Sequence, residues 1–320
     1  MKVAITGATG FVGGHLANAL LARGDQVKAL ARTPALALAE AGAEVVPGSL
    51  DDVTALRRLV EGAEVVHHVA GAIAARSEAD FMRVNAEGTA RLAEAARAAG
   101  VRRFLYVSSI AVSGPSARGK PMDEAGPARP VTPYGRSKGG GEQAVARSGV
   151  SYTIVRPPVV YGPRDKSVLK IFRLARRGYA PLLGDGLQEL SLIFAADLAR
   201  ALLAAADSPR AEGRTYHAAH PDVVTQRELV RAIGRACGRT VRTVAMPAPV
   251  VRTLVNVTAV AARMTGRRTF LDPSKTPELL APAWTCTSEA LARDAGWRAE
   301  VELARGLEET ARWYGEAGWL

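Results

Sequence analysis

The chain has 320 residues, 48% of them hydrophobic, and 31 glycines. A chain of this length and composition can bury a sizeable core, which excludes a disordered protein and suits one large domain or two closely packed ones. The formal net charge of +11 comes from basic residues scattered along the chain, so we interpret it as a solvated basic surface and expect no nucleic-acid partner.

Short apolar runs alternate with helical stretches along the chain. This order is typical of stacked βαβ units, and it predicts an α/β fold with a doubly wound parallel sheet. The predicted strands are 3–6, 27–30, 44–46, 65–69, 104–108 and 152–155, and the helices between them include 16–22, 53–60 and 85–99.

The start of the chain, the apolar stretch 250–264 and the two cysteines indicate where in the cell the protein is expected. The first residues enter a strand directly, which leaves no room there for a secretion signal. Stretch 250–264 is shorter than the roughly 20 residues that a bilayer span needs, and Arg252 interrupts it, so we expect no stable membrane insertion. Cys237 and Cys286 lack any partner motif, so we predict neither a disulfide nor a metal site. These features favour the cytoplasm.

A glycine triplet follows the first predicted strand. Gly7, Gly10 and Gly13 are spaced for a tight turn, for backbone approach to a pyrophosphate and for close packing of the next helix. Phe11 and Val12 lie between the last two glycines and are expected to contact the cofactor with them. The turn therefore predicts a dinucleotide site.

The residue after the second strand distinguishes the two nicotinamide dinucleotides. NAD enzymes usually carry an acid there, which binds the ribose hydroxyls, whereas an arginine accommodates the 2′-phosphate of NADP. At this position the chain has Arg32 and no acidic residue. NADP(H) is therefore favoured, NAD(H) stays possible, and the alternative is that Arg32 is one more surface arginine.

A tyrosine and a lysine share one face at the start of a later helix. Thr132 suits the cap and Pro133 the first helical position, so Tyr134 and Lys138 fall about one turn apart. An ammonium beside a phenol favours the phenolate, so we expect Lys138 to lower the pKa of Tyr134 from about 10. Such a tyrosine can donate or accept a proton near neutral pH.

The glycine turn, Ser109 after an apolar strand, and the pair Tyr134 and Lys138 together resemble the extended short-chain dehydrogenase/reductases, over essentially the whole chain. This resemblance implies a Rossmann-type fold and a catalytic set. Tyr134 supplies the proton, Ser109 positions the substrate oxygen, and Lys138 holds the nicotinamide ribose. Ser108 is the second candidate serine, but the register of the family selects Ser109.

The resemblance also assigns further cofactor contacts. The small-residue turn after the fourth strand, the segment after the third strand, and the Arg-Pro segment after the sixth strand are all expected to contact the dinucleotide. Their contact residues are Ala70, Gly71, Ala72, Ser49, Leu50, Pro157 and Val159. Asn85 is expected to tie a helix to the turn after the fourth strand rather than to act in catalysis. Whether the three glycines 139–141 pack against a helix or against the cofactor stays open.

The same resemblance bears on the substrate. Nucleotide-sugar epimerases usually place an arginine against the diphosphate seven residues before the aspartate that matches Asp197, and this chain has Leu190 there. Leu192, Ile193 and Phe194 are also apolar, so we expect a hydrophobic small molecule. Arg164, Lys166, Lys170 or Arg173 could replace the missing clamp. The alternatives are a nucleotide-sugar epimerase and a non-catalytic dinucleotide-binding sensor.

The expected organisation follows from these assignments. We expect residues 1–165 to form the NADP(H)-binding domain, with a returning segment near 190–222, and residues 166–320 to form a smaller, mostly helical substrate region. Four aromatic residues near the end of the chain are expected in the core of that smaller region: Trp284, Trp297, Trp313 and Tyr314. The family resemblance also implies a homodimer, formed through the helices that begin near Asn85 and Tyr134.

Overall fold

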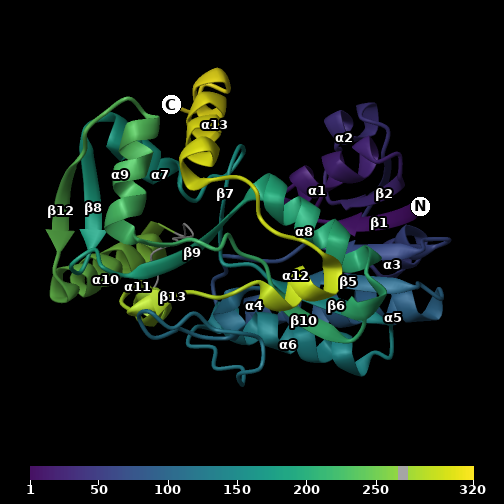
Figure 1. Cartoon of the computed structure of the whole chain (residues 1–320). Helices are drawn as coiled ribbons and strands as arrows, with labels where there is room; N and C mark the ends of the chain where they lie inside the picture. The colour runs from purple at the N-terminus through teal and green to yellow at the C-terminus, as the bar shows by residue number, and fades with distance from the viewer. Residues whose placement is uncertain (266–272) are drawn as a thin grey trace.

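The computed structural model describes residues 1–265 and 273–320, and the side chains of all of these except 260–263 and 265. A seven-stranded parallel sheet forms the centre of the larger lobe, in the order β10-β6-β5-β4-β1-β2-β3 (Figure 1). Its strands are β1 (Lys2–Thr6), β2 (Gln26–Ala31), β3 (Glu44–Pro47), β4 (Val65–His68), β5 (Arg103–Val107), β6 (Tyr152–Arg156) and β10 (Arg214–His217).

Helices cover both faces of this sheet. Helices α1 (Phe11–Ala22), α8 (Ala195–Asp207) and α12 (Glu289–Ala295) share one core with Val3 and Ile5 of β1. On the other face, α3 (Val53–Val60), α5 (Gly88–Ala98) and α6 (Pro133–Arg147) share a core with Ala4 of the same strand. Because successive side chains of a strand point to opposite faces, a continuous apolar run such as β1 indicates a sheet buried on both sides.

Short helical segments connect several of these elements. Helix α2 (Leu36–Glu40) follows β2, and α4 (Glu78–Met82) leads directly into a π-helical turn at Arg83–Glu87 ahead of α5. A short 3₁₀ helix at Ile110–Val112 follows β5.

The smaller lobe is built around β9 (Glu189–Phe194), which pairs with β7 (Val159–Tyr161), β11 (Val223–Thr225) and β13 (Ala283–Trp284). A separate two-stranded sheet joins β8 (Tyr179–Leu183) to β12 (Arg242–Met246) (Figure 1). The helices of this lobe are α7 (Leu169–Arg176), α9 (Gln226–Ala236), α10 (Ala248–Thr265), α11 (Thr276–Leu279) and α13 (Leu303–Glu316). Phe172, Trp284, Leu307 and Tyr314 lie in its core.

The structure confirms the six predicted strands of the sheet and adds β10, which the sequence pattern did not indicate. The prediction for Trp297 was wrong. Trp297 packs in the core beneath α1 and α8 rather than in the smaller lobe, because the chain returns to the sheet through α12. The division of the chain at residue 165 stays a prediction.

Candidate active site

Tyr134 and Lys138 lie on the first turns of α6. The helix starts as its sequence predicts: Thr132 is the N-cap, its Oγ1 accepts a hydrogen bond from the Gly135 amide at 3.1 Å, and Pro133 is the first helical residue. This start directs Tyr134 and Lys138 toward the carboxyl end of β5, where Ser109 follows the strand.

Close helix packing explains two of the three glycines in α6. A Cβ on Gly141 would lie 2.3 Å from the Tyr106 hydroxyl and 2.4 Å from the Asn85 carbonyl oxygen. A Cβ on Gly140 would lie 3.0 Å from Ala86 Cβ. Both contacts are made with β5 or the π-helical turn. Gly140 and Gly141 are therefore required for close packing within the protein rather than for contact with the cofactor. A Cβ on Gly139 would make only an ordinary contact with Val112.

The expectation for the Tyr134 phenol was wrong. Burial raises the pKa of Tyr134 to about 12, and the Ser109 hydroxyl beside it only partly opposes this rise. Glu278 also favours the neutral phenol. The Lys138 ammonium instead donates to the Val107 carbonyl at the end of β5.

The Lys138 ammonium is held at the end of β5. It donates a hydrogen bond to the Val107 carbonyl at 2.6 Å and lies 4.3 Å from the centre of the Tyr106 ring. The side chain is buried, and this burial lowers the pKa of Lys138 to about 7, against the opposing charge of Glu142. A buried cation that is bound by one carbonyl and one ring face has unused donors, which suits a hydroxyl-bearing ligand.

The two candidate serines point in different directions. The Ser109 hydroxyl lies beside Tyr134 and also accepts a hydrogen bond from the Ala111 amide at 3.2 Å, so it caps the short 3₁₀ helix. Ser108 is buried and donates to Glu142 Oε1 at 2.6 Å. The geometry thus agrees with the family register that selects Ser109.

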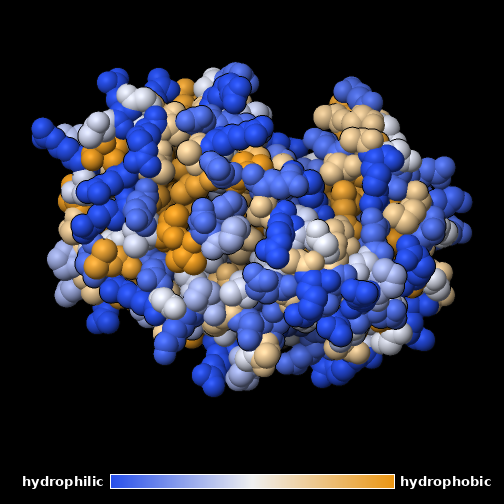
Figure 2. Space-filling view, in the orientation of Figure 1, coloured by the Kyte–Doolittle hydropathy of each residue, from blue (hydrophilic) through white to orange (hydrophobic). Residues whose placement is uncertain are grey.

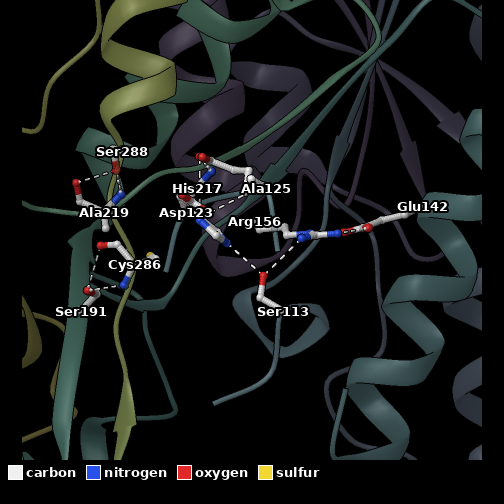
Figure 3. A network of polar contacts seen from close by, with 11 residues as sticks. Ser113, Asp123, Ala125, Glu142, Arg156, Ser191, His217, Ala219, Cys286 and Ser288 are labelled. Atoms are coloured by element: carbon white, nitrogen blue, oxygen red, sulfur yellow. Dashed lines mark hydrogen bonds and ion pairs between the residues drawn. The ribbon is translucent and has the colours of Figure 1, made fainter. Parts of the chain in front are cut away.

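A buried ion pair lies behind these groups, and the sequence reasoning missed it. Glu142 of α6 and Arg156 of β6 form two parallel contacts of 2.7 and 2.6 Å (Figure 3). Arg156 also donates to Ser113 at 3.2 Å, and Ser113 bonds His217 Nε2 at 3.0 Å. Glu142 comes four residues after Lys138, so the helical spacing that identified Tyr134 and Lys138 could have indicated it.

Glu278 of α11 is a second group that no motif indicated. Its Oε2 is buried and has no hydrogen-bond partner among the described residues, and burial raises the pKa of its carboxyl group. Its backbone carbonyl is fixed by Trp284 Nε1 at 3.0 Å. Because Glu278 affects the pKa of Tyr134, its carboxyl group belongs to the surroundings of the phenol.

The glycine turn fits a dinucleotide. Gly7 has φ of +79°, and a Cβ there would lie 2.7 Å from the Ala70 amide nitrogen. A Cβ on Gly13 would lie 2.0 Å from the Gly7 carbonyl oxygen. Gly10 precedes α1 without offering a side-chain cap, so the amides of Phe11 and Val12 at the helix start have no side-chain acceptor from the cap residue. Such a helix start is suited to a phosphate.

The turn after β4 converges on the same region. Asn85 is buried, accepts from the Ala72 amide at 2.7 Å and donates to the Ala72 carbonyl at 2.9 Å, which confirms its expected scaffold role. The Ala70 amide donates to the Thr6 hydroxyl at 3.2 Å. A Cβ on Gly71 would lie 3.6 Å from Lys138 Nζ, so the glycine leaves open the space in front of the ammonium.

The remaining predicted cofactor residues lie along the same edge of the sheet. Arg32 follows β2, is exposed, and forms no ion pair among the described residues. Ser49 accepts from the Asp51 amide at 3.2 Å, and the Leu50 side chain packs on the core below. Between β6 and β7, the Pro157 carbonyl accepts a hydrogen bond from the Ile110 amide at 3.0 Å. Val159, the first residue of β7, is partly exposed.

The apolar residues of β9 divide between two cores. Leu190, Leu192 and Phe194 pack in the smaller lobe. Ile193 was wrongly grouped with them, because alternation along the strand turns it into the core beneath α1 and α8. Of the proposed substitutes for the diphosphate clamp, Lys166 lies 5.5 Å from the Trp319 ring and Arg173 donates to the Trp319 carbonyl at 3.1 and 3.0 Å. Both therefore contact the C-terminal residues.

Comparison with known proteins agrees with this geometry. The model of the NAD dependent epimerase/dehydratase family matches residues 3–219. A ceramide reductase from Caulobacter vibrioides (strain NA1000 / CB15N) is 36% identical over 321 residues, which are 99% of this chain and 96% of that protein. A UDP-glucose 4-epimerase from Mycolicibacterium smegmatis is 30% identical over 338 residues, 98% of each chain.

A solved structure is similar over the same length. DesIV, a dTDP-glucose 4,6-dehydratase from Streptomyces venezuelae with NAD and TYD bound, matches with a TM-score of 0.79 at 25% identity, over 100% of this chain and 98% of that one. The family model spans more than half of the chain, and both relatives match over nearly their full length. The chain therefore belongs to the NAD dependent epimerase/dehydratase family.

Proposed function

We propose that the protein is an NADP(H)-dependent oxidoreductase that reduces the carbonyl group of a largely apolar small molecule, or oxidises the corresponding alcohol. The observation that carries this proposal is the meeting of the Ser109 hydroxyl and the Tyr134 phenol at the end of β5, with the Lys138 ammonium one turn along α6. The similarity to ceramide reductase over nearly the whole chain supports an apolar substrate.

In this proposal the chain's own groups handle the proton and the orientation of the substrate. A nicotinamide supplies or accepts hydride when it is bound. Tyr134 donates a proton to the carbonyl oxygen as negative charge develops there, and Ser109 donates a hydrogen bond that fixes this oxygen. Lys138 holds the nicotinamide ribose through the donors left unused by Val107.

The nature of the substrate can be tested by calorimetry with the full chain. A diphosphate is costly to desolvate and needs cationic partners, whereas Leu190 is apolar and Lys166 and Arg173 contact the C-terminal residues. We therefore expect long-chain, steroid-like or aromatic ketones to bind and to be reduced with NADPH, and UDP- and dTDP-sugars to bind at least about ten-fold more weakly. Micromolar binding confined to the nucleotide sugars would favour the epimerase alternative, which the Mycolicibacterium smegmatis relative supports.

The cofactor preference depends on Arg32. A guanidinium forms strong charge-assisted hydrogen bonds with a phosphate, and no acid at the end of β2 repels the 2′-phosphate. We expect Arg32→Ala to weaken NADPH binding by about ten-fold or more and to leave NADH binding nearly unchanged. Fluorescence titration of both cofactors measures this effect, with Arg57→Ala as the control for losing an exposed arginine of the same lobe. Equal affinities of the wild type for the two cofactors would contradict the assignment.

The proposal also includes the cellular location and the oligomeric state of the protein. We propose a cytoplasmic location, which is supported by the free thiols of Cys237 and Cys286. None of the helices in the described part of the chain combines the length and the apolar character needed to cross a bilayer. A homodimer formed through α5 and α6 stays a prediction, and sedimentation analysis can measure it.

A further inference from the structure

Glu278 carries a buried carboxyl oxygen that no described residue binds. It lies on α11 in the smaller lobe, and its Oε2 accepts no hydrogen bond from the part of the chain that the structure describes. A buried oxygen without a donor costs free energy, because the water that it loses on burial is not replaced. Such groups are rare in folded proteins, so the geometry indicates a partner that is not part of the described chain.

The main chain at Glu278 is fixed by two side chains. The Glu278 carbonyl accepts hydrogen bonds from Trp284 Nε1 at 3.0 Å and from Gln188 Nε2 at 3.3 Å. Gln188 also donates to the Ala281 carbonyl at 2.8 Å, and Trp284 is buried on β13. These contacts fix the point from which the carboxyl group extends. Its unbound oxygen therefore belongs to an ordered part of the fold and not to an exposed side chain that moves in water.

The packing of the smaller lobe brings α11 to the catalytic groups. Ile110, which directly follows the proposed catalytic serine, shares the core of this lobe with Ala281 and Trp284. The carboxyl group of Glu278 also acts electrostatically on the phenol of Tyr134. Glu278 thus approaches the phenol from the smaller lobe, whereas the proposed catalytic serine and lysine belong to the larger lobe (Figure 1).

The lobe that carries Glu278 is rich in apolar side chains. Its core includes Leu190 and Phe194, and Ala281 joins this core just after α11. Apolar side chains also reach the surface of the lobe among hydrophilic ones (Figure 2). Burial raises the pKa of the Glu278 carboxyl group, and Lys275, three residues earlier, only partly opposes this rise. A neutral donor therefore suits the group better than an ammonium ion, which would itself have to lose its water.

We propose that Glu278 determines which ketones the site accepts. Its Oε2 accepts a hydrogen bond from a neutral donor of the substrate, either a hydroxyl or an amide N–H, on a carbon close to the reacting carbonyl. This inference rests on the proposed function and narrows its substrate class from apolar ketones in general to apolar ketones that carry such a donor. Ser109 and Tyr134 bind the carbonyl oxygen, so a second polar contact at Glu278 fixes the orientation of the carbonyl for hydride transfer.

Matched ketones measure this specificity. The set is one long-chain ketone that carries either a hydroxyl or an acetamido group on the first or the second carbon from the carbonyl. Each donor has its own control, a methoxy group for the hydroxyl and an N-methylacetamido group for the acetamido group, which have no proton to donate. We expect kcat/KM of the wild type with NADPH to be at least about ten-fold higher for one of the two donors than for its control, because the control leaves Oε2 unpaired. The donor that gives this ratio distinguishes a hydroxyl substrate from an amide substrate.

Variants of Glu278 connect this ratio to the carboxyl group. Glu278→Leu removes the acceptor at similar side-chain size, so the ratio of donor to control should fall to within about two-fold of unity. The same variant should be at least as stable to denaturant as the wild type, because an unpaired buried oxygen is lost. Glu278→Gln keeps an acceptor oxygen and should keep part of the ratio. Glu308→Leu, which removes an exposed carboxyl group of α13 in the same lobe, is the matched control and should keep the wild-type ratio.

The outcomes separate the role of Glu278 from the proposed function. If the wild type reduces the ketones without distinguishing either donor from its control, or if Glu278→Leu keeps the wild-type ratio, the assignment of Glu278 is wrong and the proposed function stands. A marked loss of stability in Glu278→Leu would also overturn the assignment, because the carboxyl group would then serve the fold. If the wild type reduces none of the ketones, the proposed function fails and the assignment fails with it.

Discussion

Tyr134→Phe is expected to lower turnover by about 100-fold or more while cofactor affinity stays nearly unchanged. The substitution removes only the hydroxyl that lies beside Ser109, and the aromatic ring still fills its place next to Phe81, at 6.0 Å between ring centres. Steady-state kinetics with NADPH and a ketone substrate, together with cofactor titration, measure the two effects separately. Tyr152→Phe is the matched control, because that phenol on β6 forms no hydrogen bond among the described residues.

Lys138→Ala should differ from Tyr134→Phe by weakening cofactor binding as well as turnover, since the ammonium is proposed to hold the nicotinamide ribose and so to place the cofactor for hydride transfer. Retained turnover in Tyr134→Phe would place the acid elsewhere, and Glu278, whose carboxyl group has a raised pKa and acts on the pKa of Tyr134, would then be a candidate.

The raised pKa of Tyr134 gives the two reaction directions different responses to pH. Carbonyl reduction needs the protonated phenol, and a pKa of about 12 keeps that form present throughout the neutral range. Alcohol oxidation needs the deprotonated phenol, so its rate should rise as the pH increases above neutrality. Rates of both directions, measured across one pH series, test this sign.

Glu142→Gln is expected to destabilise the fold by about 3 kcal/mol, because it leaves the Arg156 guanidinium buried without a counter-charge. Chemical denaturation measures this loss. Glu78→Gln is the matched control. Glu78 of α4 binds Arg136 of α6 through the same two-contact geometry. Because this pair is exposed, its removal should change the stability much less.

The buried pair is also expected to position the catalytic serine. Glu142 holds Ser108 on one side of Ser109, and Arg156 holds Ser113 on the other side. Glu142→Met combined with Arg156→Met should recover much of the stability, because an apolar pair avoids the buried charge. Turnover should stay low in this double variant, with little change in KM, since the serine loses its supports. Recovery of both stability and turnover would show that the pair serves the fold alone.

The parts of this site that depend on neighbouring residues were predictable from the sequence. The start of α6 is set by Thr132 and Pro133, and the glycine turn is set by backbone requirements at Gly7 and Gly13. The parts that depend on residues far apart in the chain were not. The pKa of Tyr134 is governed by burial that only the assembled fold creates. Arg156 was noticed only within an Arg-Pro motif, and nothing local links it to Glu142.

The same distinction explains the errors in the fold. The six predicted strands are apolar runs, whereas β10 reads Arg-Thr-Tyr-His and lies at the edge of the sheet, where one side needs no partner. Trp297 follows a short helix whose direction the local sequence does not encode, so its core could not be assigned.

The position of β10 has a consequence for the biosynthesis of the protein. β6 pairs with β10 on one side, but the ribosome completes β6 at Arg156 and reaches His217 only later. At 5–20 residues per second the interval is roughly 3–12 seconds, and during it β6 is an open strand edge that can pair with another nascent chain. The yield of folded protein would then depend on how well a chaperone shields this edge during that interval. A fragment that ends at residue 165 lacks β10 altogether, so its sheet keeps the open edge permanently.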